Sequence, residues 1–492
     1  MKKNITKKLF GVILPALALL PAALHAQKKV NINWDKTLIV SKTTPTLQVV
    51  YNPYIKSSSP IYKGTFQALK DLGADYVRYV PWFPYPNAAV AELEPPTKDK
   101  TFWDFTHADP AMEDFMKAQE GHSVVINYST IPVWMWKTKT RVDYPKDADG
   151  LMWDYNQGTE LRDPSGKEVG EYFARLLSYY TKGGFTDELG KFHKSKYHYN
   201  IPYWEVLNEP DLEHKISPQL YTKLYDAIVT EMKKVSPQTK FVGLSLAHET
   251  NPEYFEYFLN AKNHKPGVPL EGISYHFYGR PSTNDHVTDS YQFSFFDQAN
   301  GFLDRVRYIE NIRKRLAPNV FTQINELGNI LLDHDYKDPI EDRYWNLSGA
   351  MYAYLFIELN KLGIDVVGES QLVGYPTQFP DVSMMNWKNG KPNARYWVLR
   401  LIKTNFGPGD KLVTTSISNQ NLMGQAFVTT KGKKLLLVNR SEKEQSLELP
   451  DATGATVNYV DLTTGDNPIG QTQLNSNTIT LKPFAVTVVS WK

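Results

Sequence analysis

Two glutamates, Glu209 and Glu326, stand where two short β-rich runs of the chain give way to loops. The first run, residues 203–210, ends in Asn-Glu-Pro. Because Pro210 cannot continue a central strand, Glu209 lies at or just past the last strand residue. The second run, residues 321–328, carries Glu326 at the same kind of boundary. Glycoside hydrolysis needs such a pair, since one carboxyl group protonates the leaving oxygen and one carboxylate attacks or stabilises the anomeric carbon.

Composition narrows the chemistry that the chain could support. It has 492 residues, 41% of them hydrophobic and 22% charged, which is typical of a globular protein. It has no cysteine, which excludes a disulfide scaffold, a zinc ribbon, an iron–sulfur site and a cysteine nucleophile. The formal net charge of +2 gives no reason to expect nucleic-acid binding. His276 is the only histidine in a strong strand-end position and no paired-histidine motif occurs, so we predict that no metal or organic cofactor is required.

Strand-like and amphipathic helix-like segments alternate from about Thr46 onward. The eight predicted strands are residues 47–51, 76–80, 123–127, 203–207, 240–244, 272–276, 320–324 and 363–368. Eight such units predict an α/β protein built on a (β/α)₈ TIM barrel, whose chemistry sits at the carboxyl ends of its strands. A doubly wound open sheet is the structural rival, but no glycine-rich phosphate loop follows the first strand.

The pattern changes after about Gly390, where short strands continue without long helical runs. Turn residues separate them at short intervals, which predicts a C-terminal antiparallel β-sandwich over residues 390–492. Residues 27–40 also resemble a strand, and we expect this strand to pair with the sandwich. The barrel is therefore predicted to span residues 41–389.

Residues 1–26 have the form of a secretory signal peptide that lies outside the fold. Lysines at the start precede an apolar run, and a small residue, Ala26, stands where cleavage would fall. The apolar run is short and interrupted by two prolines, so an uncleaved membrane anchor is the less favoured alternative. Without a cysteine a lipid anchor is excluded. We therefore expect a periplasmic or secreted protein with no membrane anchor after cleavage.

Residues 204–211 resemble the Asn-Glu-Pro signature of the clan of retaining (β/α)₈ glycoside hydrolases. Within this clan the chain most resembles glycoside hydrolase family 39, whose known members include β-xylosidases and α-L-iduronidases. Residues 273–278 are similar to that group's sixth-strand motif. The resemblance implies that Glu209 is the general acid/base, with a raised pKa, and that Glu326 is the nucleophile. It also implies that Asn208 holds the 2-hydroxyl group of the sugar.

Three further residues belong to the implied site. His276 and Tyr278 would line the same rim, with Tyr278 placed to hydrogen-bond the nucleophile. Arg78, on the second strand, could keep a carboxylate ionised through its positive charge. Residues 325–327 read Asn-Glu-Leu where the family commonly has Thr-Glu-Trp, and the histidine often found after the second strand is missing. These departures leave the reaction class unchanged and weaken the transfer of the family's sugar specificity to this chain.

Several of these residues have a structural alternative. Glu205 is expected to be a buried ion-pair partner, and Arg78 could be its partner without any part in catalysis. His276 could be a hydrogen-bonded core histidine. Glu369, at the end of the eighth strand, is a rival for Glu326 as the second carboxylate. We favour Glu326, because Glu369 would break the order seen in the resembled group.

Aromatic residues follow the second and third strands, among them Trp82 and Trp134. Their flat rings suit the C–H face of a pyranose, so we expect both to contact sugar. Long loops in a compact barrel tend to be functional, which favours a shaped pocket and removal of terminal sugars. The favoured hypothesis is a secreted retaining glycosidase similar to a β-xylosidase, acting on oligo- or polysaccharide by double displacement. Carbohydrate is the expected partner, and no oligomeric state is predicted.

Two other functions stay open. The first is a catalytically inactive carbohydrate-binding protein on a glycosidase scaffold, since a fold does not guarantee a function. The second, and less favoured, is a metal-dependent hydrolase on the same barrel. That function would need a cluster of His and Asp at strand ends, which the sequence does not offer.

Overall fold

The computed structural model describes residues 29–491, except 83–85, 141–142, 151, 153–157, 282–288, 332–339 and 377–378. The expected signal segment, residues 1–26, lies outside the described residues. Within this described part, no helix combines the length and the apolar character that a membrane span requires.

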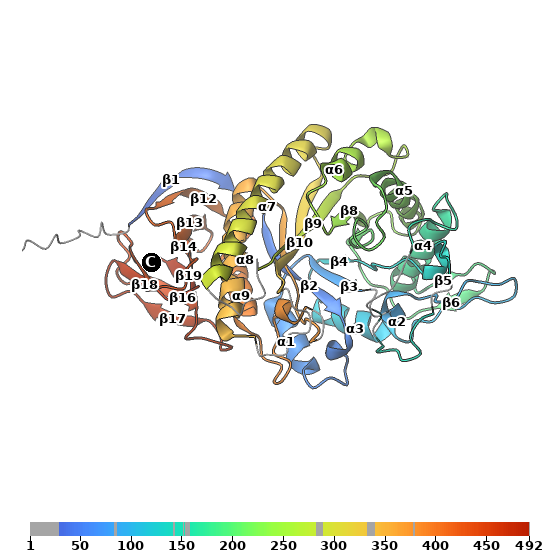
Figure 1. The fold of residues 1–492 in the computed structure, drawn as a ribbon, viewed down its shortest axis with the longest axis horizontal. Helices are drawn as coiled ribbons and strands as arrows, with labels where there is room; N and C mark the ends of the chain where they lie inside the picture. Colours follow the sequence, from blue (N-terminus) through green and yellow to red (C-terminus); the bar gives the residue numbers. More distant parts are fainter. Residues whose placement is uncertain are drawn as a thin grey trace, which may run out of the picture.

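Among the described residues, eight parallel strands close into a barrel in the order β10-β11-β2-β3-β4-β7-β8-β9. The barrel occupies the right-hand part of the molecule in Figure 1. Its strands are β2 (Thr44–Tyr51), β3 (Val77–Pro81), β4 (Val124–Ile126), β7 (Tyr203–Glu205), β8 (Lys240–Leu246), β9 (Gly272–Gly279), β10 (Phe321–Asn329) and β11 (Val366–Glu369). Most strand residues are buried, because helices cover the outer face and packed side chains fill the inside. The predicted parallel barrel is confirmed.

Helices follow each barrel strand, and those after the first seven strands lead to the next strand, whereas the last helix leads into the C-terminal domain. The helices are α1 (Tyr62–Leu72), α2 (Pro86–Ala89), α3 (Ala108–Ala118), α4 (Lys167–Lys182), α5 (Pro218–Val235), α6 (Pro252–Phe258), α7 (Asp289–Leu316), α8 (Asp342–Leu362) and α9 (Ala394–Asn405). A small hairpin of β5 (Gly184–Thr186) and β6 (Phe192–Lys194) follows α4. Local sequence sets these boundaries: Ser217 caps α5 by accepting from the N–H of Leu220 at 3.2 Å, and Pro218 begins the helix.

Helix α9 corrects the predicted domain boundary. The sequence prediction starts the β domain at residue 390, but residues 394–405 form the helix that completes the eighth β/α unit. Asn393 caps it by accepting from the N–H of Arg395, and its apolar face, with Val398 and Ile402, is buried. The predicted boundary at residue 390 therefore falls ahead of a helix, because Tyr396, Trp397 and Val398 are residue types enriched in strands and local propensity favours the β-rich region.

The C-terminal domain is built from antiparallel strands and lies on the left in Figure 1, next to α8 and α9. One sheet has the order β1-β12-β13-β14-β19-β16-β17, and β15 pairs with β18 in a second sheet. The strands are β1 (Val30–Val40), β12 (Lys411–Ile417), β13 (Leu422–Thr429), β14 (Gly432–Asn439), β15 (Gln445–Glu448), β16 (Thr456–Val460), β17 (Gly470–Gln473), β18 (Thr478–Leu481) and β19 (Val486–Ser490). Leu435, Leu447 and Ile479, from both sheets, share one hydrophobic core.

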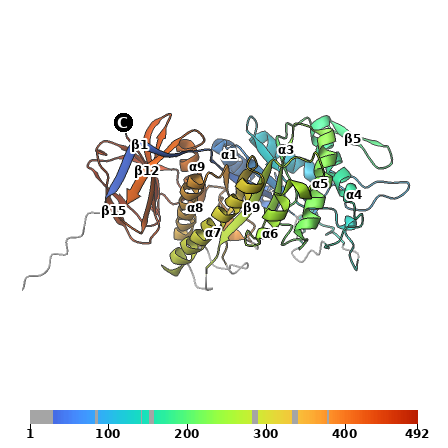
Figure 2. The ribbon, with the colours of Figure 1, turned by 90° about the horizontal axis from the view of Figure 1, so that it is seen from above.

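Strand β1 joins the first part of the chain to this last domain. It pairs antiparallel with β12, so that Val30 lies opposite Ile417 and Val40 opposite Lys411. Figure 2 shows the two strands side by side on the C-terminal domain. Val30 is completely buried in the core of that domain, whereas Val40 at the other end of the strand is 52% exposed.

Replacing Val30 by Ala should therefore destabilise the C-terminal domain. Loss of buried methyl groups and the cavity left behind predict a decrease of about 1–2 kcal/mol in the free energy of unfolding. Urea unfolding followed by circular dichroism would measure this change. Val40→Ala is the matched control on the same strand, and it should change the stability by less than about 0.5 kcal/mol. Equal effects of the two substitutions would contradict the placement of Val30 in the core.

Candidate active site

A turn directly after β7 presents Asn208 and Glu209 at the carboxyl end of the barrel. β7 ends at Glu205, so Glu209 lies further into the loop than its sequence context predicts. Leu207 and Glu209 have positive φ angles of 64° and 40°. Such conformations cost about 1–3 kcal/mol each and concentrate at functional sites. The N–H of Glu209 donates to the carbonyl of Ser245 at 2.9 Å, which ties the turn to the neighbouring strand β8.

A β-bulge in β10 brings Glu326 into the same space. The register of β10 against β9 shifts between Ile324 and Glu326. In a regular strand, Asn325 and Glu326 would point to opposite faces. Here the side-chain amide of Asn325 donates to Glu205 at 2.6 Å inside the barrel, and Glu326 reaches Arg78 in the same interior. The bulge thus re-aims a side chain at the strand end, as bulges beside active sites often do.

Arg78 is 1% exposed, and its guanidinium group contacts both the turn after β7 and the bulge in β10. It makes five hydrogen bonds of 2.5–3.0 Å, to Glu205, Gln48, Glu326, Asn208 and Ser245. The expected ion pair between Glu205 and Arg78 is present and fully buried. Arg78 also contacts Glu326, so it is both a structural partner and a charge next to the candidate nucleophile.

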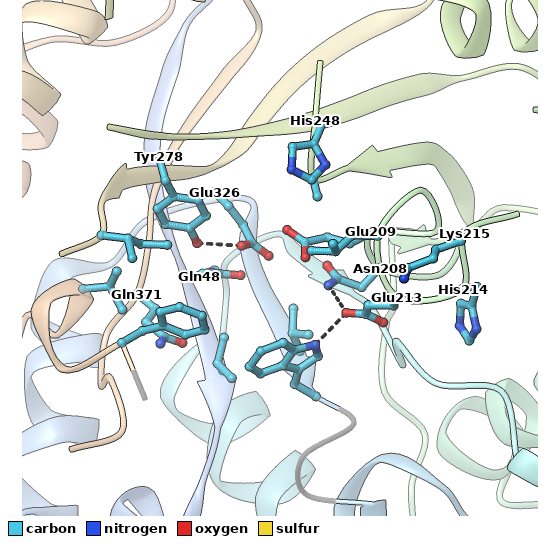
Figure 3. A pocket seen from close by; sticks show the side chains of 18 of the residues that line it. Gln48, Asn208, Glu209, Glu213, His214, Lys215, His248, Tyr278, Glu326 and Gln371 are labelled. Carbon is cyan, nitrogen blue, oxygen red and sulfur yellow. Dashed lines mark hydrogen bonds between the residues drawn. The ribbon is translucent and has the colours of Figure 1, made fainter. Parts of the chain in front are cut away.

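His276 and Tyr278, both on β9, connect the two candidate catalytic glutamates. Nδ1 of His276 lies 2.8 Å from Oε1 of Glu209 and 3.5 Å from Oε2 of Glu326. The hydroxyl of Tyr278 donates to Oε2 of Glu326 at 2.7 Å, the contact expected from the sequence (Figure 3). His276 is completely buried, yet it hydrogen-bonds Glu209 and faces Glu326, so it is more than a core histidine.

The surroundings shift the two carboxyl groups in opposite directions. Burial, together with the charges of Glu326 and Asp211, raises the pKa of Glu209, although His276 acts against this. Burial also raises the pKa of Glu326, but His276, Arg78 and the Tyr278 hydroxyl outweigh burial and hold that pKa below its ordinary value. One carboxyl group is thus favoured as an acid and the other as a carboxylate.

Glu209 and Glu326 face a cavity of about 530 Å³ at the carboxyl end of the barrel, whereas the buried Arg78 and His276 are not among its lining residues. Trp82, Asn208, Glu209, Tyr278 and Glu326 line it, as the sequence predicts. The cavity wall also contains polar residues that sequence reasoning missed, namely Gln48, Glu213 and Gln371. A signal for Gln48 was present, because it is the one amide in the apolar run Thr44–Tyr51.

Two residues considered from the sequence, Trp134 and Glu369, do not line this cavity. Trp134 is not among the residues that line it: its indole N–H donates to the carbonyl of Glu92 at 2.9 Å, and the guanidinium of Arg162 lies 4.6 Å from its ring. Trp134 therefore lies outside this cavity, and its contact with sugar stays a prediction. Glu369 does not line the cavity either, since it is buried against Arg395 behind the cavity wall.

One cluster of the described residues could bind a metal ion. Glu209, His276 and Glu326 offer atoms that all lie within 4.8 Å of one another. Both oxygens of Glu326, however, already accept hydrogen bonds, from Arg78 and from Tyr278. Arg78 also supplies a buried positive charge at this position. The donor set therefore suits a pair of interacting carboxyl groups better than a cation site.

Comparison with known proteins finds a matching family model for part of the chain and solved structures with a similar fold. The family model for the D-apionate lactonase C-terminal immunoglobulin-like domain matches residues 420–489. No curated protein matches the chain. The family 51 arabinofuranosidase from Xanthomonas axonopodis pv. citri superposes with a TM-score of 0.64 at 12% identity, covering 95% of this chain and 100% of that chain. A family 30 endoxylanase from Clostridium papyrosolvens C71 gives 0.58 at 13% identity, covering 94% and 99%.

A third similar structure is the family 51 α-L-arabinofuranosidase from Thermotoga petrophila RKU-1, with a TM-score of 0.61 at 13% identity, covering 94% of this chain and 100% of that chain. The chain therefore has the (β/α)₈ barrel and antiparallel C-terminal domain that these glycoside hydrolases share. These similar structures belong to glycoside hydrolase families 51 and 30. The resemblance of this chain to family 39 stays a prediction from sequence motifs.

Arg78→Met should destabilise the protein by about 3–5 kcal/mol, because it leaves Glu205 as an unpaired charge in the barrel interior. Urea denaturation would give the change in the free energy of unfolding. The double variant Arg78→Met/Glu205→Gln should recover part of this loss, since it removes the orphaned charge. A single variant as stable as the wild type would contradict the central place of this ion pair.

Proposed function

We propose that the protein is a retaining glycoside hydrolase that removes terminal sugars from oligo- or polysaccharide by double displacement. The observation that carries this proposal is the pair Glu209 and Glu326, whose carboxyl oxygens approach within 4.8 Å and whose pKa values are shifted in opposite directions. Retaining enzymes hold their carboxyl groups about 5–5.5 Å apart, whereas inverting enzymes need about 6.5–9.5 Å to admit a water molecule.

In the first step, Glu326 attacks the anomeric carbon and Glu209 gives its proton to the glycosidic oxygen of the departing group. A covalent glycosyl-enzyme and a free alcohol result. In the second step, Glu209 takes a proton from water, the water oxygen attacks the anomeric carbon, and Glu326 leaves as a carboxylate. Arg78 and Tyr278 stabilise the Glu326 carboxylate before attack and after release.

His276 and Asn208 support the same reaction. Because His276 bonds Glu209 and also faces Glu326, its proton can follow the change of charge between the two glutamates. Asn208 lines the cavity beside Glu209, where its amide can hold the 2-hydroxyl group of the sugar, a contact that strengthens in the transition state. Trp82 offers an aromatic face in the cavity wall.

The sugar we propose is a pentose, and a β-xyloside is the first candidate. The resemblance to family 39 supports β-xylosidase activity, and the similar structures from Xanthomonas and Thermotoga are arabinofuranosidases, which also act on pentosides. A cavity rather than an extended groove supports action on a chain end. The form of residues 1–26 supports a periplasmic or secreted enzyme.

Glu209→Gln should lower the hydrolysis of nitrophenyl glycosides by about 10²–10⁴-fold, since the variant cannot transfer a proton. Glu444→Gln, an exposed acid in the C-terminal domain, is the control and should keep wild-type activity. A panel that includes β-xylosides and α-L-arabinofuranosides would be assayed, with the anomer of the first-formed sugar read by NMR. An inverted product would contradict double displacement, and a wild-type protein that binds but hydrolyses no glycoside would favour a carbohydrate-binding protein.

Activity should show a bell-shaped pH profile. Hydrolysis needs ionised Glu326, so the rate falls as the pH drops through its lowered pKa. It also needs protonated Glu209, so the rate falls as the pH rises through its raised pKa. Tyr278→Phe removes a donor that stabilises the Glu326 carboxylate, and should therefore move the acid limb of kcat/KM to higher pH. An unchanged acid limb would contradict the role of Tyr278.

A further inference from the structure

A third carboxyl group, that of Glu213, lies in the wall of the same cavity and has no part in double displacement. It belongs to the turn that carries Glu209, because the N–H of Glu213 donates to the carbonyl of Glu209 at 2.8 Å. Figure 3 shows its side chain next to Asn208, and the indole N–H of Trp82 also donates to it. It is thus placed beside the residues expected to hold the sugar.

Glu213 is bonded through one oxygen to two N–H groups. Its Oε1 accepts from the side-chain amide of Asn208 at 2.8 Å and from the indole of Trp82 at 2.6 Å. The orientation of the Asn208 amide is not free, because its Oδ1 accepts from Arg78 at 2.6 Å and Arg78 can only donate. The Nδ2 group must therefore face Glu213, and Asn208 is held at both ends.

The surroundings of the other oxygen, Oε2, indicate the protonation state in which Glu213 holds Asn208 and Trp82. Oε2 is buried and receives no hydrogen bond from the described residues. A buried carboxylate oxygen without a donor is costly, whereas a buried neutral acid costs less. Burial and the nearby charges of Glu209 and Glu326 also raise the pKa of Glu213 well above its ordinary value.

We propose that Glu213 is a positioning residue that, as a neutral carboxylic acid, clamps the Asn208 amide and the Trp82 indole in the cavity wall. One N–H of Asn208 is held by Glu213, and this leaves its second N–H for the 2-hydroxyl group of the sugar. This inference rests on the proposed function, because the clamp matters only for a bound glycoside. A neutral acid has a further advantage here, since a negative charge on Glu213 would raise the pKa of Glu326, which must be ionised to attack.

Substitution by Gln and by Met separates this role from the alternatives. Glu213→Gln keeps an Oε1 acceptor without charge, so kcat/KM should stay within about threefold of the wild type. Glu213→Met keeps the length of the side chain but removes the acceptor, and it should lower kcat/KM by about 10²-fold, the typical effect of misplacing a substrate contact. An equal loss in both variants would overturn the proposal, because it would mean that the role needs the carboxylate.

A double-mutant cycle shows whether Glu213 acts through Asn208. On the background of Asn208→Ala, or with a 2-deoxy glycoside as substrate, Glu213→Met should lose little further activity. A merely structural role would lower activity by the same factor in every background, and that outcome would overturn the proposal. Urea unfolding of each variant would show whether it is folded before its activity is compared.

The protonation state can be measured without any activity. Carbon-13 NMR of protein labelled at the glutamate carboxyl carbons, compared with Glu213→Gln, should assign to Glu213 a resonance of a protonated carboxyl group at neutral pH. A carboxylate resonance would overturn the proposal. If the wild-type protein hydrolyses no glycoside, the proposed function fails, and the NMR result still decides whether Glu213 is the neutral acid.

Discussion

The candidate site depends on one buried guanidinium group. Arg78 uses all five of its N–H donors on acceptors that come from four different parts of the barrel: Gln48 on β2, Glu205 and Asn208 in and after β7, Ser245 on β8 and Glu326 on β10. A buried charge of this kind is tolerated only when every partner is in place. The same bonds that satisfy Arg78 therefore fix the strand ends relative to one another, and with them the geometry of the carboxyl pair.

Much of this arrangement could be predicted from single residues. Pro210 cannot continue a strand, which indicates that Glu209 lies near a strand end. Alternation along β7 directs Glu205 into the barrel, so its role as a buried ion-pair partner can be predicted from the sequence. Strand-like runs of five or six residues separated by amphipathic segments predict the parallel barrel, because both faces of its strands are buried. The Asn-Glu-Pro motif then pointed to the acid, and the structure places Asn208 and Glu209 together in the cavity.

Other features cannot be predicted from a sequence pattern. They break the regular periodicity of a strand or depend on contacts with residues that are distant in the sequence. The bulges in β8 and β10 change which side chains point inward, and no local signal gives their position. Glu213 looks like an ordinary loop acid until Asn208 and Trp82 are seen to donate to it. Trp134 follows a strand as a sugar platform would, but its indole N–H donates to the Glu92 carbonyl and it does not line the cavity. Helix α9 contains Tyr396, Trp397 and Val398, which are residue types enriched in strands, so local propensity does not set it apart from the following strands.

The pairing of β1 with β12 also has a consequence for how the chain folds. The N–H of Lys29 reaches the side chain of Ser418, 389 positions away, so the sheet joins segments from opposite ends of the sequence. Contacts of such high sequence separation carry a large loop-closure entropy, and folding rates fall as their share grows. Closure of the barrel has the same character, because β2 pairs with β11 and Thr44 lies opposite Val366. The C-terminal sheet takes β1 from before the barrel and its other strands from after the barrel, so cutting the backbone at one point separates neither domain intact.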